Sequence, residues 1–251
     1  MGRKFLKLSY SGAGFHGWQS QPNACSVQQT IEEALSIILR TPTPIVGAGR
    51  TDTGVNARVM YAHFDTETCI EKERLLNGLN RLCGHEIAFH DIIDVADDAH
   101  ARFDATSRTY KYFVNYEKSP FTDSFSWHSP TVLDTDEMNL AAEILLNTDD
   151  FTSFAKLHSD SKTNICNVRH AAWENRENEY GIPGAVFTIT ADRFLRNMVR
   201  AVVGTLVEVG RGKMTTEGFR KVIESKNRCS AGTSMPAAAL FLWDITYPYI
   251  D

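Results

Sequence analysis

The alternation of hydrophobic and polar positions divides the chain into short segments of two kinds. Segments that alternate with a period of two, or that are continuously apolar over a few residues, predict strands, because successive side chains of a strand point to opposite faces. Such segments cover residues 4–10, 59–64, 87–95, 108–116, 185–191 and 240–247.

Helical periodicity fills the intervals between these segments. Apolar residues recur three and four positions apart in 27–39, 72–82, 135–146, 194–209 and 216–224. Residues with small polar side chains precede three of these segments and are expected as N-caps: Ser26, Asp134 or Thr135, and Thr215 or Thr216. Residues 151–169, rich in Ser, Thr, Asn, Asp and Lys, predict a long mobile loop of the kind that touches substrate.

Strands and helices interleave twice along the chain, with no long linker of Pro, Gly and Ser between the two series. This order predicts an α+β fold built from two ferredoxin-like halves, at 1–106 and 107–251. A chain of 251 residues with 43% hydrophobic content is large enough for two small cores. A cleft between two such halves is the expected place for a ligand.

The composition bears on the cellular compartment in which the protein is expected. There is no run of eighteen apolar residues for a membrane span, and the segment from Met1 to Leu6 lacks the core of a signal peptide. The five cysteines are widely spaced and odd in number, without a Cys-x-x-Cys pair. Reduced thiols and a cytoplasmic location are therefore expected.

The charge balance needs to be read locally. The sum of 26 basic and 31 acidic residues, −5, argues weakly against a nucleic-acid partner. However, residues 133–150 hold six acids and no Lys or Arg, whereas residues 192–228 hold nine Lys or Arg and four acids. Either these runs are solvated helix faces, or one molecule carries a basic face and an acidic back.

The most informative candidate for chemistry is Asp52, which stands between Arg50 and Gly54. Glycine permits a backbone path that other residues resist, and a nearby arginine favours an ionised carboxylate. Spacing alone leaves three roles open for such an aspartate. It could form a structural salt bridge, bind a metal with further carboxylates, or act as a nucleophile.

The remaining motifs argue against a nucleotide cofactor and against a metal site. Gly12-x-Gly14-x-x-Gly17 follows a strand, but Pro22 prevents the helix that a dinucleotide-binding turn must open into, so no nucleotide cofactor is expected. The eight histidines form no His-Glu-x-x-His motif, so no metal is expected. No Gly-x-Ser-x-Gly elbow is present either.

Two groups of residues have both a structural and a functional interpretation. On the strand at 108–116, alternation places Tyr110 and Tyr112 on one face, where they could pack in the core or present a ring to a base. In the predicted helix at 194–209, helical spacing places Arg193, Arg196 and Arg200 on one face, either solvated or facing phosphates.

Several motifs together resemble the tRNA pseudouridine synthase A family. The string Arg-Thr-Asp-x-Gly-Val-x-Ala around Asp52 is similar to the family's signature. Further motifs follow in the family's order at 10–21, 27–35, 99–103, 108–112, 151–154, 198–204 and 240–242. The resemblance extends from about Phe5 to Pro248, and ordered motifs are far more specific than a single one.

The resemblance implies a pseudo-twofold pair of α+β halves with a central antiparallel sheet flanked by helices. It implies a cofactor-free isomerase that acts on tRNA as a homodimer and converts uridine to pseudouridine at positions 38, 39 and 40. Asp52 would be the catalytic nucleophile, and the substrate would be bound by Tyr110, Arg50, Arg200 and Leu240. The expected RNA-binding residues are Arg193, Arg196, Lys162 and Lys213.

Three residues near the aspartate depart from the family's pattern. Thr53 stands where Ala is usual, Asn56 where His is usual, and Met60 where Gln is usual. These departures concern contacts around the aspartate rather than the aspartate itself. A non-catalytic RNA-binding module of the same fold is the alternative to the enzyme.

Overall fold

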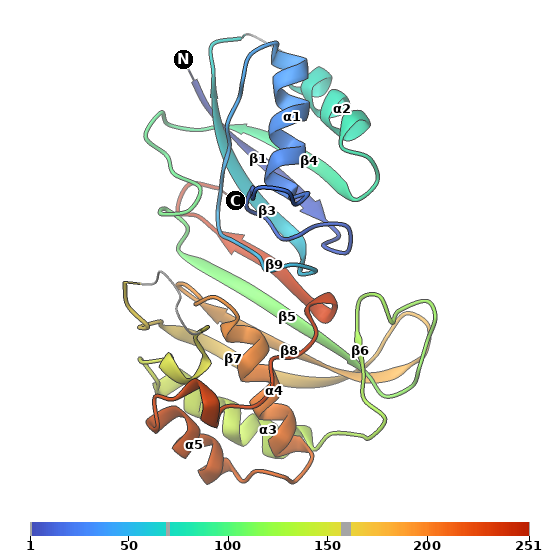
Figure 1. Ribbon diagram of the computed structural model, residues 1–251, viewed down its shortest axis with the longest axis vertical. Helices are drawn as coiled ribbons and strands as arrows, with labels where there is room; N and C mark the ends of the chain where they lie inside the picture. Colours follow the sequence, from blue (N-terminus) through green and yellow to red (C-terminus); the bar gives the residue numbers. More distant parts are fainter. Residues whose placement is uncertain (1, 69–70, 157–161, 251) are drawn as a thin grey trace. The chain divides into compact units, whose positions relative to one another are not determined.

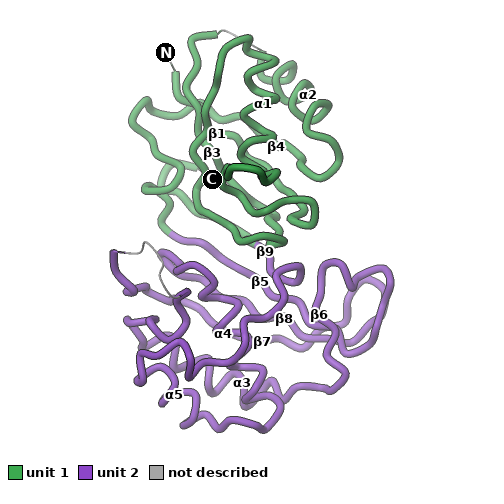
Figure 2. Tube along the Cα trace, in the orientation of Figure 1, with its two compact units in different colours: residues 1–106, 242–251 green, residues 107–241 purple. Residues whose placement is uncertain are grey.

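The computed structural model describes residues 2–68, 71–156 and 162–250 (Figure 1). The chain forms two compact units, residues 1–106 with 242–251, and residues 107–241 (Figure 2). Residues 242–251 belong with the first unit, although they follow the second unit in the chain. The predicted α+β class is confirmed, because each unit combines antiparallel strands with helices.

The first unit is an antiparallel sheet with two helices, and residues 242–246 of the last strand of the chain also belong to it. In chain order its elements are β1 (Gly2–Tyr10), α1 (Val27–Leu39), β2 (Val46–Gly47), β3 (Asn56–Thr66), α2 (Lys72–Leu82) and β4 (Ile87–Asp94). β1 pairs with both β4 and β3, and β2 pairs with the other edge of β3. The two helices lie side by side on one face of this sheet, and Ser26 caps α1 as expected (Figure 1).

The end of the chain is anchored in this unit by aromatic packing. The ring of Tyr247 meets the rings of Phe5 and Tyr61 edge-on, at centroid distances of 5.4 and 5.2 Å. Its hydroxyl donates to the carbonyl of Ala101, and Thr106 N donates to the carbonyl of Thr246. These contacts explain why the last residues belong with the first unit.

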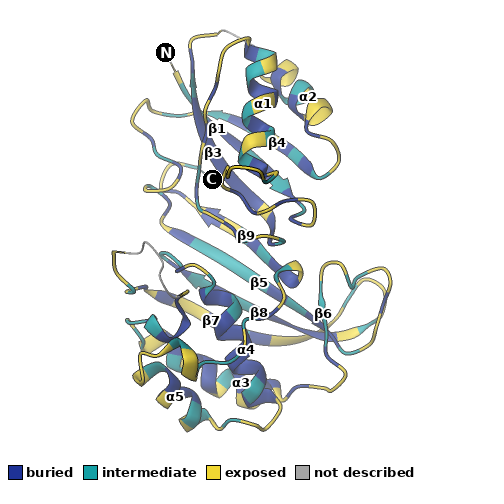
Figure 3. Cartoon of the chain, in the orientation of Figure 1, coloured by how far each residue is buried: buried dark blue, intermediate teal, exposed yellow. Residues whose placement is uncertain are grey.

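The second unit repeats the plan with longer connections. Its elements are β5 (Ser107–Asn115), β6 (Trp127–His128), α3 (Thr135–Ala142), β7 (Val168–Glu177), β8 (Pro183–Ala191), α4 (Met198–Gly210) and α5 (Thr216–Glu224). Short 3₁₀ turns lie at Glu143–Asn147, Thr152–Phe154, Arg228–Ser230 and Ala237–Ala239, and β9 (Leu240–Thr246) carries the chain onward. β8 pairs antiparallel with both β5 and β7, and the three helices pack against one another, with α4 almost wholly buried (Figure 3).

The structure corrects two expectations. The helix predicted to start at residue 194 starts at Met198, because Asn197 adopts a left-handed conformation with φ of 65° that ends any helix arriving from residue 194. β7 was missed because it is an exposed edge strand with few apolar residues. Part of the loop predicted over 151–169, residues 157–161, lies outside the described residues.

Candidate active site

Asp52 opens a tight turn between β2 and β3. Val55 N donates to the carbonyl of Asp52 at 3.1 Å, and Gly54 within the turn has φ of 79°, a value that suits glycine. Asp52 is half-buried, Thr51 is buried and Arg50 is exposed. The turn therefore presents one carboxylate from a fixed backbone, with an arginine two residues before it.

The loop that follows β1, residues 11–21, packs against this turn. We refer to it as the glycine loop. Trp18 N donates to the carbonyl of Thr51 at 3.3 Å, and the hydroxyls of Tyr10 and Thr51 are 2.9 Å apart in a buried contact. Gly17 has φ of 92°, and a Cβ on it would lie 2.5 Å from the carbonyl oxygen of Thr51. Close packing against the Asp52 turn thus accounts for this glycine.

All three departures from the family's pattern belong to the first unit, and two of them are buried. Asn56 is buried, and its Oδ1 accepts a hydrogen bond of 2.9 Å from Gly12 N. Met60 is also fully buried, whereas Thr53 is exposed on the turn. Asn56 therefore joins the glycine loop to the start of β3, which gives this departure a structural role.

Three side chains of β5 that alternate along the strand contact residues outside the helices of the second unit. Two of these partners precede α4, and the third follows α5. Arg108 Nη1 donates to the carbonyl of Asp192 at 2.8 Å. The half-buried ring of Tyr110 meets Phe194 edge-on at 5.1 Å. Tyr112 is fully buried and donates to the carbonyl of Pro236 at 3.2 Å, and burial raises the pKa of its hydroxyl. Tyr112 is therefore a core residue, whereas Tyr110 retains an accessible surface.

Arg200 lies in the first turn of α4 and is held at both its backbone and its side chain. Arg200 Nε donates to the carbonyl of Met235 at 2.6 Å, and Met235 N donates to the carbonyl of Arg200 at 3.1 Å. Leu240, a few residues further along the same returning segment, is buried at 4% exposure. The second unit thus fixes the positions of Arg200 and Leu240 through one segment.

The prediction that the arginines share a helix face is wrong for Arg193 and Arg196, because both precede the start of α4. Arg193 Nη1 donates to the carbonyls of Thr163 and Ile165 at 3.2 and 3.3 Å, so this residue ties its segment to the loop at 163–165. Arg196 is exposed and offers its carbonyl to Lys156 N.

The two predicted lysines are also separated. Lys162 is exposed close to the carbonyl that Arg193 binds. Lys213 lies just beyond the C-terminal end of α4 and is 3.9 Å from Glu208. A helix of 13 residues is about 20 Å long, so Lys213 is remote from Arg196. The four basic residues do not form one cluster.

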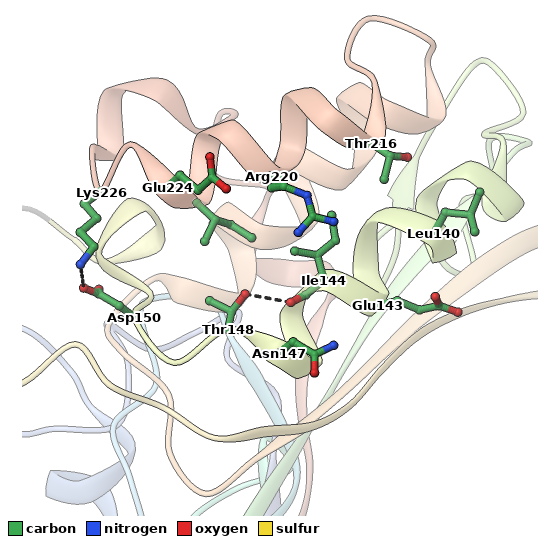
Figure 4. A pocket seen from close by; sticks show the side chains of 11 residues that line it. Leu140, Glu143, Ile144, Asn147, Thr148, Asp150, Thr216, Arg220, Glu224 and Lys226 are labelled. Atoms are coloured by element: carbon green, nitrogen blue, oxygen red, sulfur yellow. Dashed lines mark hydrogen bonds and ion pairs between the residues drawn. The ribbon is translucent and has the colours of Figure 1, made fainter.

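A cavity in the second unit lies apart from all of these residues. It measures about 480 Å³ and is bounded by α3, the 3₁₀ turn that follows it and α5 (Figure 4). Charges of both signs line it, including the ion pair between Lys226 and Asp150 at 2.9 Å. No residue expected to act on the substrate contributes to this cavity. Among the described residues, no three His, Cys, Asp or Glu side chains are grouped as a metal site, and no helix is long and apolar enough to cross a membrane.

Sequence reasoning missed the contacts that hold the candidates in place. Arg50 and Asp52 belong to the first unit, and Tyr110, Arg200 and Leu240 to the second. The supporting contacts come from Asn56, Phe194 and the carbonyl of Met235. An asparagine among apolar strand residues was the one visible signal, whereas a backbone carbonyl leaves no trace in a sequence.

Comparisons with known proteins agree on one family. A family model described as tRNA pseudouridine synthase matches residues 141–248. The chain is 57% identical to the tRNA pseudouridine synthase A of Parabacteroides distasonis over 99% of this chain and 97% of the relative. The same name is carried by relatives from Bacteroides thetaiotaomicron, with 54% identity over 99% of this chain and 91% of the relative, and from Aliivibrio salmonicida, with 37% identity over 97% and 92%.

One solved structure shows only a weak similarity to this chain. Thermus thermophilus Cse3 bound to RNA aligns over 85% of this chain and 95% of its own, at 10% identity and a TM-score of 0.24. This similarity is too low to support a conclusion about the fold or the function of the chain. The sequence relatives, by contrast, match almost end to end. With 57% identity over nearly the whole of both chains, this protein belongs to the tRNA pseudouridine synthase A family.

Proposed function

We propose that this protein is an isomerase that converts uridine to pseudouridine in the anticodon arm of tRNA, at positions 38, 39 and 40, with Asp52 as the nucleophile and without a cofactor. The observation that carries the proposal is the construction around Asp52. A glycine turn presents the carboxylate, and that turn is supported by Trp18 of the glycine loop and by Tyr10 at the end of β1. A salt-bridge residue on a surface does not need such support.

The reaction suits a single carboxylate. The N-glycosidic bond breaks, the uracil turns, and a carbon–carbon bond forms between C1′ and C5. A proton leaves C5 and one is gained at N1, so the isomerisation consumes no oxidant and no hydride. Asp52 attacks either C1′ of the ribose or C6 of the ring, and in both cases the carboxylate can leave again.

The remaining candidates have roles in holding the substrate. Tyr110 stacks on the base, and its hydroxyl is available for the C5 proton. Leu240 provides an apolar wall that prevents escape of the detached uracil. Arg50, on the turn of Asp52, and Arg200, fixed by Met235, are substrate-binding cations.

RNA binding is assigned to the basic residues with exposed side chains. Arg196, Lys162 and Lys213 contact phosphates, and extraction of the target uridine from its helix, which costs a few kcal/mol, is offset by such contacts. Arg193 contributes by holding the loop at 163–165 in position.

The ferredoxin-like character of each half belongs to the same proposal. In the first unit, β1 pairs with β4 and β3, and β2 pairs with β3; these pairings, with the chain order β1-α1-β2-β3-α2-β4, support this part of the proposal. The second unit follows with β5-α3-β7-β8-α4 and the order β5-β8-β7. Homodimer formation and a cytoplasmic location are further parts of the proposal and rest on the family resemblance.

The decisive test is Asp52→Asn, with Glu67→Gln as a matched control that removes one exposed negative charge after β3. Pseudouridine in bulk tRNA and tritium released from C5 of uridine are measured. Asp52→Asn should abolish both signals and leave tRNA affinity within about threefold, because binding rests on phosphates. The control should match the wild type.

Two results would contradict the proposal. Residual turnover above a few per cent in Asp52→Asn would remove Asp52 from the nucleophile role. Wild-type protein that binds tRNA but forms no pseudouridine would favour the non-catalytic RNA-binding module.

A further inference from the structure

An exposed aromatic side chain stands on a turn that the proposed chemistry does not use. Phe103 is 73% exposed and lies in the turn formed by residues 99–104, between β4 and β5. Residues 101–104 form turns, and the following strand, β5, begins at Ser107. We refer to this segment as the 99–104 turn.

The 99–104 turn is held by its own hydrogen bonds. Asp104 Oδ2 accepts from His100 N at 2.7 Å and from the hydroxyl of Tyr249 at 2.8 Å. His100 Nδ1 accepts from the backbone amides of Arg102 and Phe103 at 3.1 and 3.3 Å. The backbone that carries Phe103 is therefore ordered before any ligand arrives.

The same turn is anchored in the core of the first unit. Ala101 is fully buried, and its amide donates to His63 Nδ1 at 3.1 Å, while its carbonyl accepts from Tyr247. Arg3 Nη1 donates to the carbonyl of Ala99 at 3.0 Å. These contacts fix the backbone of the turn on the core, while the ring of Phe103 is exposed.

The surroundings of the ring are those of a stacking surface. The imidazole of His100 lies 4.3 Å from the ring of Phe103 with an interplanar angle of 35°, and the guanidinium of Arg102 is 5.7 Å from the ring centroid. Unpaired bases stack on aromatic rings in this way, and a neighbouring arginine can bind the adjoining phosphate.

A plain exposed phenylalanine is the competing explanation, since isolated surface apolar residues are common. Phe121 illustrates it: its ring is 71% exposed, yet it is stacked at 5.5 Å on Tyr180 from another loop. The ring contacts described for Phe103 come from its own turn, and they include a cation. The two residues therefore form a natural comparison.

We propose that Phe103, with Arg102 and His100, is a platform on which an unpaired base of the tRNA stacks, at a place separate from the reacting uridine. His63, which binds the turn through Ala101, is seven residues along β3 from Asn56 (63 − 56), about 23 Å at 3.3 Å per residue. The platform is thus at the opposite end of β3 from the Asp52 turn. This inference rests on the proposed function, because that function supplies the RNA.

The experiment compares Phe103→Ala, Phe103→Trp and Phe121→Ala, with tRNA affinity, kcat and KM measured for each full-length protein at one salt concentration. Phe103→Ala should weaken tRNA binding by about 5- to 100-fold and raise KM, with kcat within about twofold of wild type. Phe103→Trp should restore affinity, because it restores a ring. Phe121→Ala, a change of equal exposure, should have no effect.

A second arm uses a blunt RNA duplex, which has no unpaired base. Its affinity should be the same for Phe103→Ala and for wild type. Equal tRNA affinity of Phe103→Ala and wild type, an equal loss in Phe121→Ala, or an equal loss for the duplex would each overturn the platform. Failure of the wild type to make pseudouridine would refute the proposed function alone, because the affinity series still decides the platform.

Discussion

His63 should make the first unit sensitive to mild acid. It lies on β3 at 6% exposure, with its ring stacked on Phe5 at 6.0 Å and edge-on to His100 at 4.7 Å. Its Nδ1 accepts a hydrogen bond from Ala101 N, so the folded ring is neutral with its proton on Nε2. Burial, and then the charges of Arg3 and His100, lower the pKa of His63 from 6.5 to about 4.

The direction of the effect follows from proton binding. Between pH 6.5 and about 4 the unfolded chain protonates His63 and the folded chain does not, so the free energy of unfolding falls as the pH falls through this window. A difference of about 2.5 pKa units corresponds to roughly 3 kcal/mol. Asp65 and Asp104 act at lower pH, because hydrogen bonds from Arg3, and from His100 and Tyr249, hold their pKa values below 3.8.

The test is urea unfolding of the wild type and of His63→Asn at several pH values between 7 and 4. The asparagine Oδ1 can still accept from Ala101 N but does not titrate. The variant should be less stable at pH 7 because it loses the stacking on Phe5. From pH 7 to pH 4 the wild type should lose about 3 kcal/mol more than the variant. Parallel losses in the two proteins would refute the reasoning.

Three further predictions concern the candidate site. Tyr110→Ala should lose about 1–3 kcal/mol more transition-state stabilisation, measured from kcat/KM, than Tyr110→Phe, because only alanine removes the stacking ring. Equal losses in the two variants would assign the role to the hydroxyl. Asn56→Leu should reduce the free energy of unfolding by about 1–3 kcal/mol, since Gly12 N loses its acceptor, and an unchanged urea midpoint would contradict this. Arg196→Ala should flatten the slope of log affinity against log salt by about 0.7–0.9 and weaken all tRNAs alike, whereas an unchanged slope would make Arg196 a solvated residue.

The local elements of the fold could be predicted where their periodicity is strong. α1 coincides with its predicted span of 27–39, and β5 lies within one residue of its predicted start. Asp52 was identifiable because its glycine and arginine neighbours are adjacent in the chain. These are features in which the residues that matter lie within a few positions of one another.

The exceptions show where local information ends. β7 is an edge strand whose polar residues carry no clear alternation, and its pairing with β8 is what makes it a strand. The start of α4 was misplaced because a left-handed Asn197 interrupts an otherwise helical pattern. Arg193 lies before α4 rather than on its face, and its side chain donates to the carbonyls of Thr163 and Ile165.

The sequence by itself determined the class of fold, the family and the candidate nucleophile. Only the tertiary structure decided that Gly17 packs on the Asp52 turn and that Asn56 joins the strand after that turn to the glycine loop. It also decided that Ala101 anchors the turn that carries the exposed Phe103. Periodicity and motifs report on neighbours along the chain. Burial and hydrogen bonding are decided by groups tens of residues apart, which only the packed chain brings together.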